Sequence, residues 1–160
     1  MNPTPPVLRR LFQIAALITT TGLAPAQANS ACESAEFRAA AERLLAQVDA
    51  RWQARDPAGM AALYHPQGQL RIQPGGVVAD GQAGVARLFT QLFPTLSPED
   101  DHLLSLLRVT PVGGLCALDT RAVVGSTKGA AAQRFQGFYL VDPTGAEPRI
   151  LAVSAVRATP

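Results

Sequence analysis

The spacing of apolar residues changes along the chain, from a helical period in the first half to strict alternation in the second. From about residue 31 to residue 55, apolar side chains recur at intervals of three and four. This spacing predicts a first helix, and Ser30 and Glu33 stand at the spacing of a capping box at its start. The inward positions of this helix would be Phe37, Ala41, Leu44, Leu45, Val48 and Trp52.

A short second helix and a hairpin are predicted next. The Asp-Pro pair at 56–57 is typical of the start of a helix, which would end near His65. From Gly68 the apolar period is two, which predicts a strand, a Pro-Gly-Gly turn and a brief partner strand. On the first of these strands, Leu70 and Ile72 share one face.

A third helix and four strands complete the pattern. An Asp-Gly pair at 80–81 opens the third helix, which Pro94 stops. Four runs rich in β-branched and aromatic residues follow, separated by turn residues. These runs cover about residues 102–110, 115–126, 133–142 and 149–158. Helices followed by consecutive strands predict an α+β fold.

The first 28 residues read as a targeting segment. Arg9 and Arg10 precede an apolar run, and the small-residue exit Ala-Gln-Ala ends at Ala28. The run is shorter than the roughly 20 residues of a membrane-spanning helix, which disfavours an anchor. We therefore expect a signal peptide over 1–28 and a single exported domain over 29–160, periplasmic or secreted, with no membrane association after cleavage.

Cleavage would also change the charge balance. The chain has 14 Lys+Arg and 12 Asp+Glu residues, and only Arg9 and Arg10 lie in the targeting segment. The remaining domain would carry equal numbers of cationic and acidic side chains, and its arginines are scattered singly. This distribution argues against nucleic acid as a partner.

Two cysteines, Cys32 and Cys116, belong to the predicted mature domain. Export would bring them to a compartment where disulfides persist, so a bond between them is the favoured interpretation. The alternative is a pair of buried thiols, because spacing alone cannot show that the two Cα atoms approach each other.

The order of elements, with the segments WQARDPAGMAALYHPQGQL (52–70) and ADGQAGVARLF (79–89), resembles the nuclear transport factor 2-like superfamily, including its ketosteroid isomerase-like and SnoaL-like branches. The resemblance implies a cone-shaped fold, a cystatin-like roll in which a curved antiparallel or mixed sheet wraps around three helices. It also implies an apolar cavity between sheet and helices, the usual ligand site of such folds.

The resemblance suggests which residues line this cavity. Trp52 and Tyr64 would enter it from the helices, although aromatic residues at helical spacing are more often core. The strands would contribute further candidates for ligand binding. These are Gln73, Gln136, Phe138 and Arg157, the last aimed at the cavity by alternation through Val153 and Ala155.

Isomerases of this superfamily pair a carboxylate base with a tyrosine and a protonated aspartic acid. Counted from the shared motifs, these positions fall at Gln73, Val48 and Gln136, none of which supplies the required group. We therefore expect a domain that binds a small hydrophobic or amphipathic molecule without isomerising it.

Two alternatives remain open. One is a lyase, isomerase or cyclase acting on a hydrophobic substrate, with His102, Asp80 and Tyr64 as the acid–base set. The other is an interaction module whose cavity is filled by its own side chains. We predict no cofactor and no metal, because two histidines without matching ligands do not make a metal site.

The last strands are apolar on both faces, as in FQGFYLV (135–141) and ILAVSAV (150–156). An exposed apolar sheet face needs a cover. We therefore expect a homodimer formed through the sheet.

Overall fold

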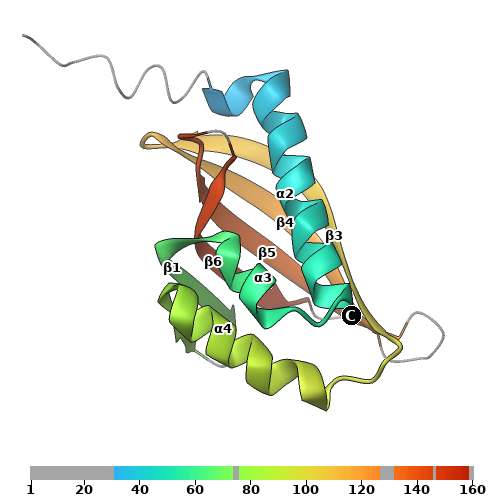
Figure 1. Ribbon diagram of the computed structural model, residues 1–160. Coiled ribbons are helices and arrows are strands. Elements are labelled where there is room, and N and C mark those ends of the chain that lie inside the picture. Colours follow the sequence, from blue (N-terminus) through green and yellow to red (C-terminus); the bar gives the residue numbers. More distant parts are fainter. Residues whose placement is uncertain (1–30, 74–75, 127–131, 146, 159–160) are drawn as a thin grey trace, which may run out of the picture.

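The computed structural model describes residues 31–158 except 74–75, 127–131 and 146, so the predicted signal peptide over 1–28 lies outside the described residues. Helices and strands follow one another in the order that the sequence predicts (Figure 1). They are α2 (Ala35–Gln53), α3 (Pro57–Ala62), β1 (Tyr64–Gln73), β2 (Val77–Asp80), α4 (Gly81–Leu92), the 3-10 turn η1 (Phe93–Thr95), β3 (Asp100–Val112), β4 (Leu115–Ser126), β5 (Gln133–Asp142) and β6 (Arg149–Arg157).

Side-chain caps set where the first two helices begin. The Ser34 hydroxyl accepts a hydrogen bond from the amide of Phe37 at 3.0 Å, and the backbone of Ser34 is extended. The predicted first helix is therefore interrupted at this residue, with residues 31–33 helical on one side and α2 on the other. Asp56 caps α3 as expected, because its carboxylate accepts from the amide of Gly59 at 2.8 Å.

The six strands form one mixed sheet in the order β2-β1-β6-β5-β4-β3. The four strands from β3 to β6 are consecutive and antiparallel, which confirms the prediction from the alternating second half. The first strand joins them out of sequence order, because β1 pairs in parallel with β6. Leu70 faces Val153 in this pairing.

Strand β1 begins earlier than the sequence suggests. His65 was expected at the end of the second helix, yet the strand starts at Tyr64. The reason is tertiary, because the carbonyl of Leu63 accepts a hydrogen bond from the amide of Ile150 at 3.0 Å and Tyr64 pairs with that residue. Contacts with a strand so distant in sequence leave no local signal.

The helices α2, α3 and α4 lie on the same side of the sheet (Figure 1). Helix α2 packs along β3, whereas α4 packs against β1 and α3. The sheet is open, and its inward face meets the helices around a single apolar core. The predicted α+β class and the arrangement of sheet and helices are confirmed.

The predicted disulfide is present between Cys32 and Cys116, whose Cα atoms lie 5.5 Å apart. Both residues are buried, and the bond ties the start of the described chain to β4. Within the described ranges, no helix has the length and hydropathy that crossing a bilayer requires.

We expect the disulfide to be a major source of stability. Its loss frees a loop spanning 84 residues in the unfolded chain. The double variant Cys32→Ala/Cys116→Ala should lose about 4 kcal/mol of unfolding free energy, measured by urea denaturation. The fully reduced wild-type chain is the control for side-chain loss and should show a similar decrease. An unfolding midpoint that is unchanged in both would contradict this assignment.

Candidate functional site

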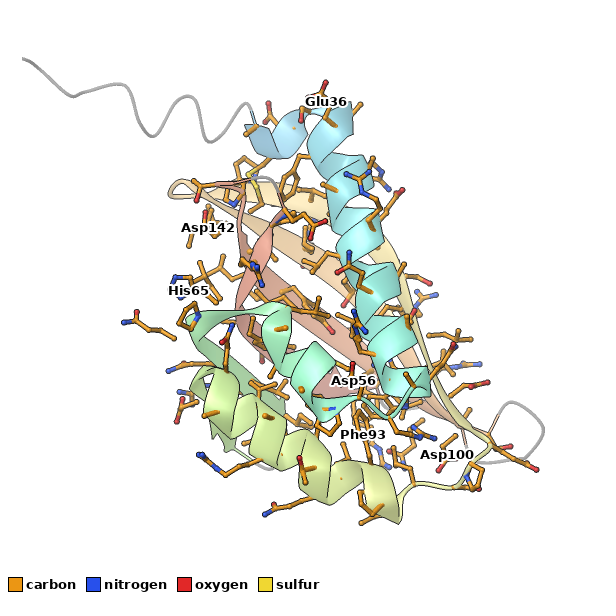
Figure 2. All side chains as sticks on the ribbon, in the orientation of Figure 1. Glu36, Asp56, His65, Phe93, Asp100 and Asp142 are labelled. Atoms are coloured by element: carbon orange, nitrogen blue, oxygen red, sulfur yellow. A yellow bond between two sulfur atoms is a disulfide. The ribbon has the colours of Figure 1, made fainter. Side chains whose placement is uncertain are left out.

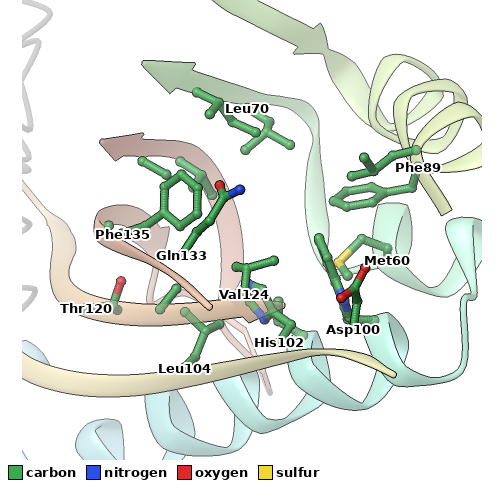
Figure 3. Close-up of a pocket in the computed structure, with 18 of the residues that line it drawn as sticks. Met60, Leu70, Phe89, Asp100, His102, Leu104, Thr120, Val124, Gln133 and Phe135 are labelled. Atoms are coloured by element: carbon green, nitrogen blue, oxygen red, sulfur yellow. The ribbon is translucent and has the colours of Figure 1, made fainter. Parts of the chain in front are cut away.

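A cavity of about 540 Å³ lies between the inward face of the sheet and the helices (Figure 3). Its walls are mostly apolar and come from every part of the fold. Helices and the turn after α4 contribute Val48, Met60, Leu88, Phe89 and Leu96, and the strands contribute Leu70, Leu104, Val124, Phe135 and Val153.

Strand alternation decides which side chains reach this cavity. On β4, Thr120, Ala122 and Val124 face inward. On β5, Phe135 and Tyr139 face inward. Gln136 and Phe138, which alternate with these inward positions, therefore belong to the outer face.

This alternation corrects three predicted ligand contacts. Gln73 and Gln136 are exposed and lie outside the cavity lining, because their inward neighbours are Ile72 and Phe135. Phe138 is 40% exposed on the outer face of β5. Positions counted from a family resemblance gave these residues the wrong orientation, and strand periodicity overrides that count.

The inward neighbours do not restore the isomerase residues. Ile72 and Phe135 face the cavity beside the positions where that mechanism places its base and its acid, and neither side chain carries a carboxyl group. Val48, at the position of the tyrosine, is an apolar part of the wall.

Arg157 has the orientation that the sequence predicts but not the burial. It pairs with the cavity-lining residue Phe135 at the end of β6, and it shares the inward phase of Val153 and Ala155. Its side chain is exposed and lies outside the lining. Its guanidinium group is therefore hydrated, as is usual for arginine at a strand end.

Trp52, Tyr64 and His102 all line the cavity. The Trp52 ring stacks on the imidazole of His102, with centroids 4.6 Å apart and planes 25° apart. Phe89 and Phe93 meet the edges of Trp52 at 6.0 and 5.6 Å. This aromatic cluster fixes His102 in one orientation at one end of the cavity.

Asp49 holds His102 from the other side. Its Oδ1 lies 2.8 Å from His102 Nδ1, and its Oδ2 accepts a hydrogen bond from the amide of Leu104 at 3.0 Å. The side chains of Asp49 and His102 are only 18% and 10% exposed. When Nδ1–H donates its hydrogen bond to the Asp49 carboxylate, neutral His102 carries its lone pair on Nε2, where it can act as a base.

Asp49 replaces Asp80 as the acidic partner of His102. Asp80 is exposed at the start of α4 and lies outside the lining, so the predicted set of His102, Asp80 and Tyr64 is not brought together. Sequence reasoning missed Asp49, although a signal was available. It stands four residues after Leu45 and three before Trp52, which is the spacing of one helix face.

The other histidine lies elsewhere. His65 is half-buried in β1, and its Nδ1 accepts from the amide of Gln67 at 3.2 Å. It is well separated from Asp100 and from Phe93, which belongs to the aromatic cluster (Figure 2).

Two buried tyrosines, Tyr64 and Tyr139, face the cavity. Burial raises the pKa of both phenols well above the ordinary value, and each is raised further by a neighbour. For Tyr64 that neighbour is Tyr139, and for Tyr139 it is the Asp49 carboxylate. Both hydroxyls therefore keep their protons and act as hydrogen-bond donors.

Two polar atoms in the cavity wall have no hydrogen-bond partner among the described residues. They are Nε1 of Trp52 and Oγ1 of Thr120, and both atoms are buried. Buried polar groups are nearly always paired in folded proteins. The hydrogen-bonding capacity of these two groups is therefore not used within the described residues.

Arg55 holds the segment that joins η1 to β3. Its guanidinium donates to the carbonyls of Ser97 and Asp100 at 2.9 and 2.8 Å and lies over the ring of Phe93. Leu96 and Asp100 of this segment line the cavity. The guanidinium thereby keeps one wall of the cavity in place.

Within the part of the chain that the structure describes, no cluster of three or more histidine, cysteine or acidic side chains has the geometry of a metal site.

No protein-family model matches the chain, and no curated protein matches it in sequence. Solved structures match its fold. An NTF2-like protein with a cystatin-like fold from Novosphingobium aromaticivorans aligns with a TM-score of 0.67 and 19% identity, over 76% of this chain and 82% of that protein. A ketosteroid isomerase-like protein from Erwinia carotovora atroseptica aligns with a TM-score of 0.64 and 16% identity, over 79% and 100%.

A scytalone dehydratase-like protein, also from Novosphingobium aromaticivorans, aligns with a TM-score of 0.62 and 16% identity, over 81% of this chain and 89% of that protein. At these identities the likeness concerns the fold. The chain has the nuclear transport factor 2-like, cystatin-like fold that its sequence pattern resembles.

The two tyrosines should not ionise in the native protein near pH 10. They are the only tyrosines in the chain, and both are buried with raised pKa values. Unfolded tyrosines lose their protons at about pH 10, so the unfolded state binds fewer protons above that pH. The free energy of unfolding should then fall by about 1.4 kcal/mol per tyrosine for each further pH unit.

Tyrosinate absorbance followed during alkaline titration measures this behaviour. We expect it to rise together with the loss of helical circular dichroism. A rise at about pH 10 with the fold intact would show that the phenols are accessible to water.

Proposed function

We propose that this domain binds a small, mostly apolar molecule in the cavity between sheet and helices. The observation that carries the proposal is the cavity itself, whose volume of about 540 Å³ lies within the range of small-molecule sites. A cavity of this size also argues against an interaction module filled by its own side chains.

The lining indicates what kind of molecule fits. Asp100 is the one acidic residue among the described lining residues, and the described lining contains no lysine or arginine. An anionic ligand would therefore lose its hydration without gaining a counter-ion. Trp52 and Tyr64 offer aromatic surface with a polar edge, which suits an uncharged ring compound.

Binding can be tested with the neutral fluorescent probe N-phenyl-1-naphthylamine. We expect its emission to rise and shift to the blue on addition of the protein, because the cavity excludes water. The variant Ala155→Phe fills part of the cavity from β6 and should weaken binding roughly tenfold or more.

The matched control is Ala152→Phe on the same strand. Ala152 lies outside the cavity lining and pairs with Leu140, so this variant should bind the probe like the wild type. Equal binding by both variants would place the probe outside the cavity and remove the support for this function.

A second candidate function is acid–base catalysis on the bound molecule. The contact of 2.8 Å between Asp49 and His102 favours it, because a carboxylate that orients a buried imidazole is a common way to prepare a general base. Of the solved structures with a similar fold, one is named a ketosteroid isomerase-like protein and another is named for scytalone dehydratase. A lyase, isomerase or cyclase reaction on a hydrophobic substrate would use this pair.

The proton-abstracting ability of His102 can be measured with 5-nitrobenzisoxazole, a small neutral compound that opens when a base removes its ring proton. If the pair acts as a base, the wild type should open it faster than His102→Asn by about 100-fold or more. Asparagine at this position keeps a donor to Asp49 and removes the titrating nitrogen. His65→Asn, which changes the chain's other histidine, is the control and should behave like the wild type. Equal rates in wild type and His102→Asn would exclude the pair as a base and leave ligand binding as the function.

We also propose that the domain is exported, to the periplasm or out of the cell, after removal of residues 1–28. The buried disulfide between Cys32 and Cys116 supports this, because such bonds persist in oxidising compartments. Mass measurement of the protein secreted by its host would locate the cleavage point.

Finally, we propose a homodimer that covers the outer face of the sheet. Leu103, Phe138 and Val156 on β3, β5 and β6 are 46%, 40% and 49% exposed, which is unusual for large apolar side chains grouped on one sheet. Light scattering after size exclusion should give the mass of two chains. The variant Phe138→Glu should give the mass of one chain while still binding the probe. A single-chain mass for the wild type would contradict the proposal.

A further inference from the structure

Thr120 is the buried polar residue whose place in the cavity wall is least explained by folding. It is 1% exposed, and its Oγ1 has no hydrogen-bond partner among the described residues. The side chain projects from β4 into the cavity (Figure 3). A valine of the same shape would fill this position without leaving a polar atom unpaired.

Gly137 lies directly beside this hydroxyl. It pairs with Thr120 across β4 and β5, and both residues line the cavity. A Cβ atom at Gly137 would collide with Thr120 Oγ1 and would lie 3.4 Å from Cε2 of Tyr139. The missing side chain therefore leaves room for the Thr120 hydroxyl next to the Tyr139 ring.

The hydroxyl of Tyr139 is a second unpaired group, on a residue that lines the same cavity. The phenol is 7% exposed, lines the cavity and makes no hydrogen bond within the described structure. Its raised pKa keeps it protonated and therefore a donor. Thr120 can also present a donor, because its hydroxyl hydrogen turns about the Cβ–Oγ1 bond, and rotation about the Cα–Cβ bond can move the hydroxyl to another staggered position without moving the backbone.

We propose that Thr120 and Tyr139 form a recognition point for an uncharged oxygen of the ligand such as a carbonyl or ether oxygen, and that Gly137 makes room for the Thr120 hydroxyl there. Two donors match the two lone pairs of one such oxygen. The described lining supplies no lysine or arginine to balance an anionic oxygen. The negative charge of the Asp49 carboxylate, which raises the pKa of Tyr139, also disfavours an anionic oxygen beside that phenol. The inference rests on the proposed binding function and assigns the chemical class of the ligand.

This point differs from the polar positions that the isomerase resemblance implies. Those positions fall at Val48, Gln73 and Gln136, of which the first is apolar and the other two face outward. The recognition point is therefore a property of this chain's own side chains.

The test compares two compounds of nearly the same shape, 2-acetylnaphthalene and 2-isopropenylnaphthalene, of which only the first carries an oxygen. Each is used to displace N-phenyl-1-naphthylamine from the wild type and the variants. The wild type should prefer the oxygen compound by about 3- to 10-fold for each hydrogen bond formed. The preference should shrink in Thr120→Val and in Tyr139→Phe, and disappear in the double variant.

Thr120→Ser keeps the hydroxyl and is the matched control, so it should retain the preference. The free protein provides an independent reading. Because the Thr120 hydroxyl has no partner, Thr120→Val without ligand should be at least as stable as the wild type. A clear loss of stability would show that the hydroxyl serves the fold and would overturn the proposal.

Two other results distinguish a failure of the recognition point from a failure of the binding function. If the wild type binds both compounds equally, or the double variant keeps the preference, the recognition point is wrong while cavity binding stands. If N-phenyl-1-naphthylamine and both compounds fail to bind the wild type, the binding function and the recognition point fall together.

Discussion

The site depends above all on the way that Asp49 joins a helix to the edge strand. One carboxylate oxygen meets His102 Nδ1 and the other accepts from the amide of Leu104, so a single side chain of α2 holds two successive inward positions of β3. This contact sets how α2 lies against the sheet, and with the stacked Trp52 ring it also orients the imidazole. Loss of the carboxylate would leave the part-buried Leu104 amide unpaired, at a cost of about 1–3 kcal/mol.

Much of the fold could be predicted from the sequence, because its helices and antiparallel strands follow from local patterns. The apolar stripe of α2, the Asp-Pro start of α3 and the alternation in β4 each depend on neighbours within a few residues. The start of β1 at Tyr64 could not be predicted in this way. That boundary depends on Ile150, whose amide bonds to Leu63 from the far end of the chain.

Less of the site could be predicted, because a site depends on which face a residue occupies. The family resemblance suggested Trp52 and Tyr64 as cavity residues, residue type suggested His102 as an acid–base candidate, and all three line the cavity. The face of β5 was ambiguous, since the run from 135 to 141 is apolar on both sides and no polar alternation fixes its phase. Asp49 was overlooked because an acidic residue beside a helix stripe is usually solvated, and only the fold shows its buried partner.

The parallel pairing of β1 with β6 has a consequence for the order of folding. In the described structure, the β1–β2 hairpin reaches the rest of the sheet only through β6, the last strand of the chain. Strands β3, β4 and β5 can form their ladder as soon as they are available, because each contacts the next in sequence. The other edge of β1 has no strand partner until residues 149–157 are in place as β6. The cavity, which has walls on both sides of that seam, therefore cannot close until β6 has joined β1 to the rest of the sheet.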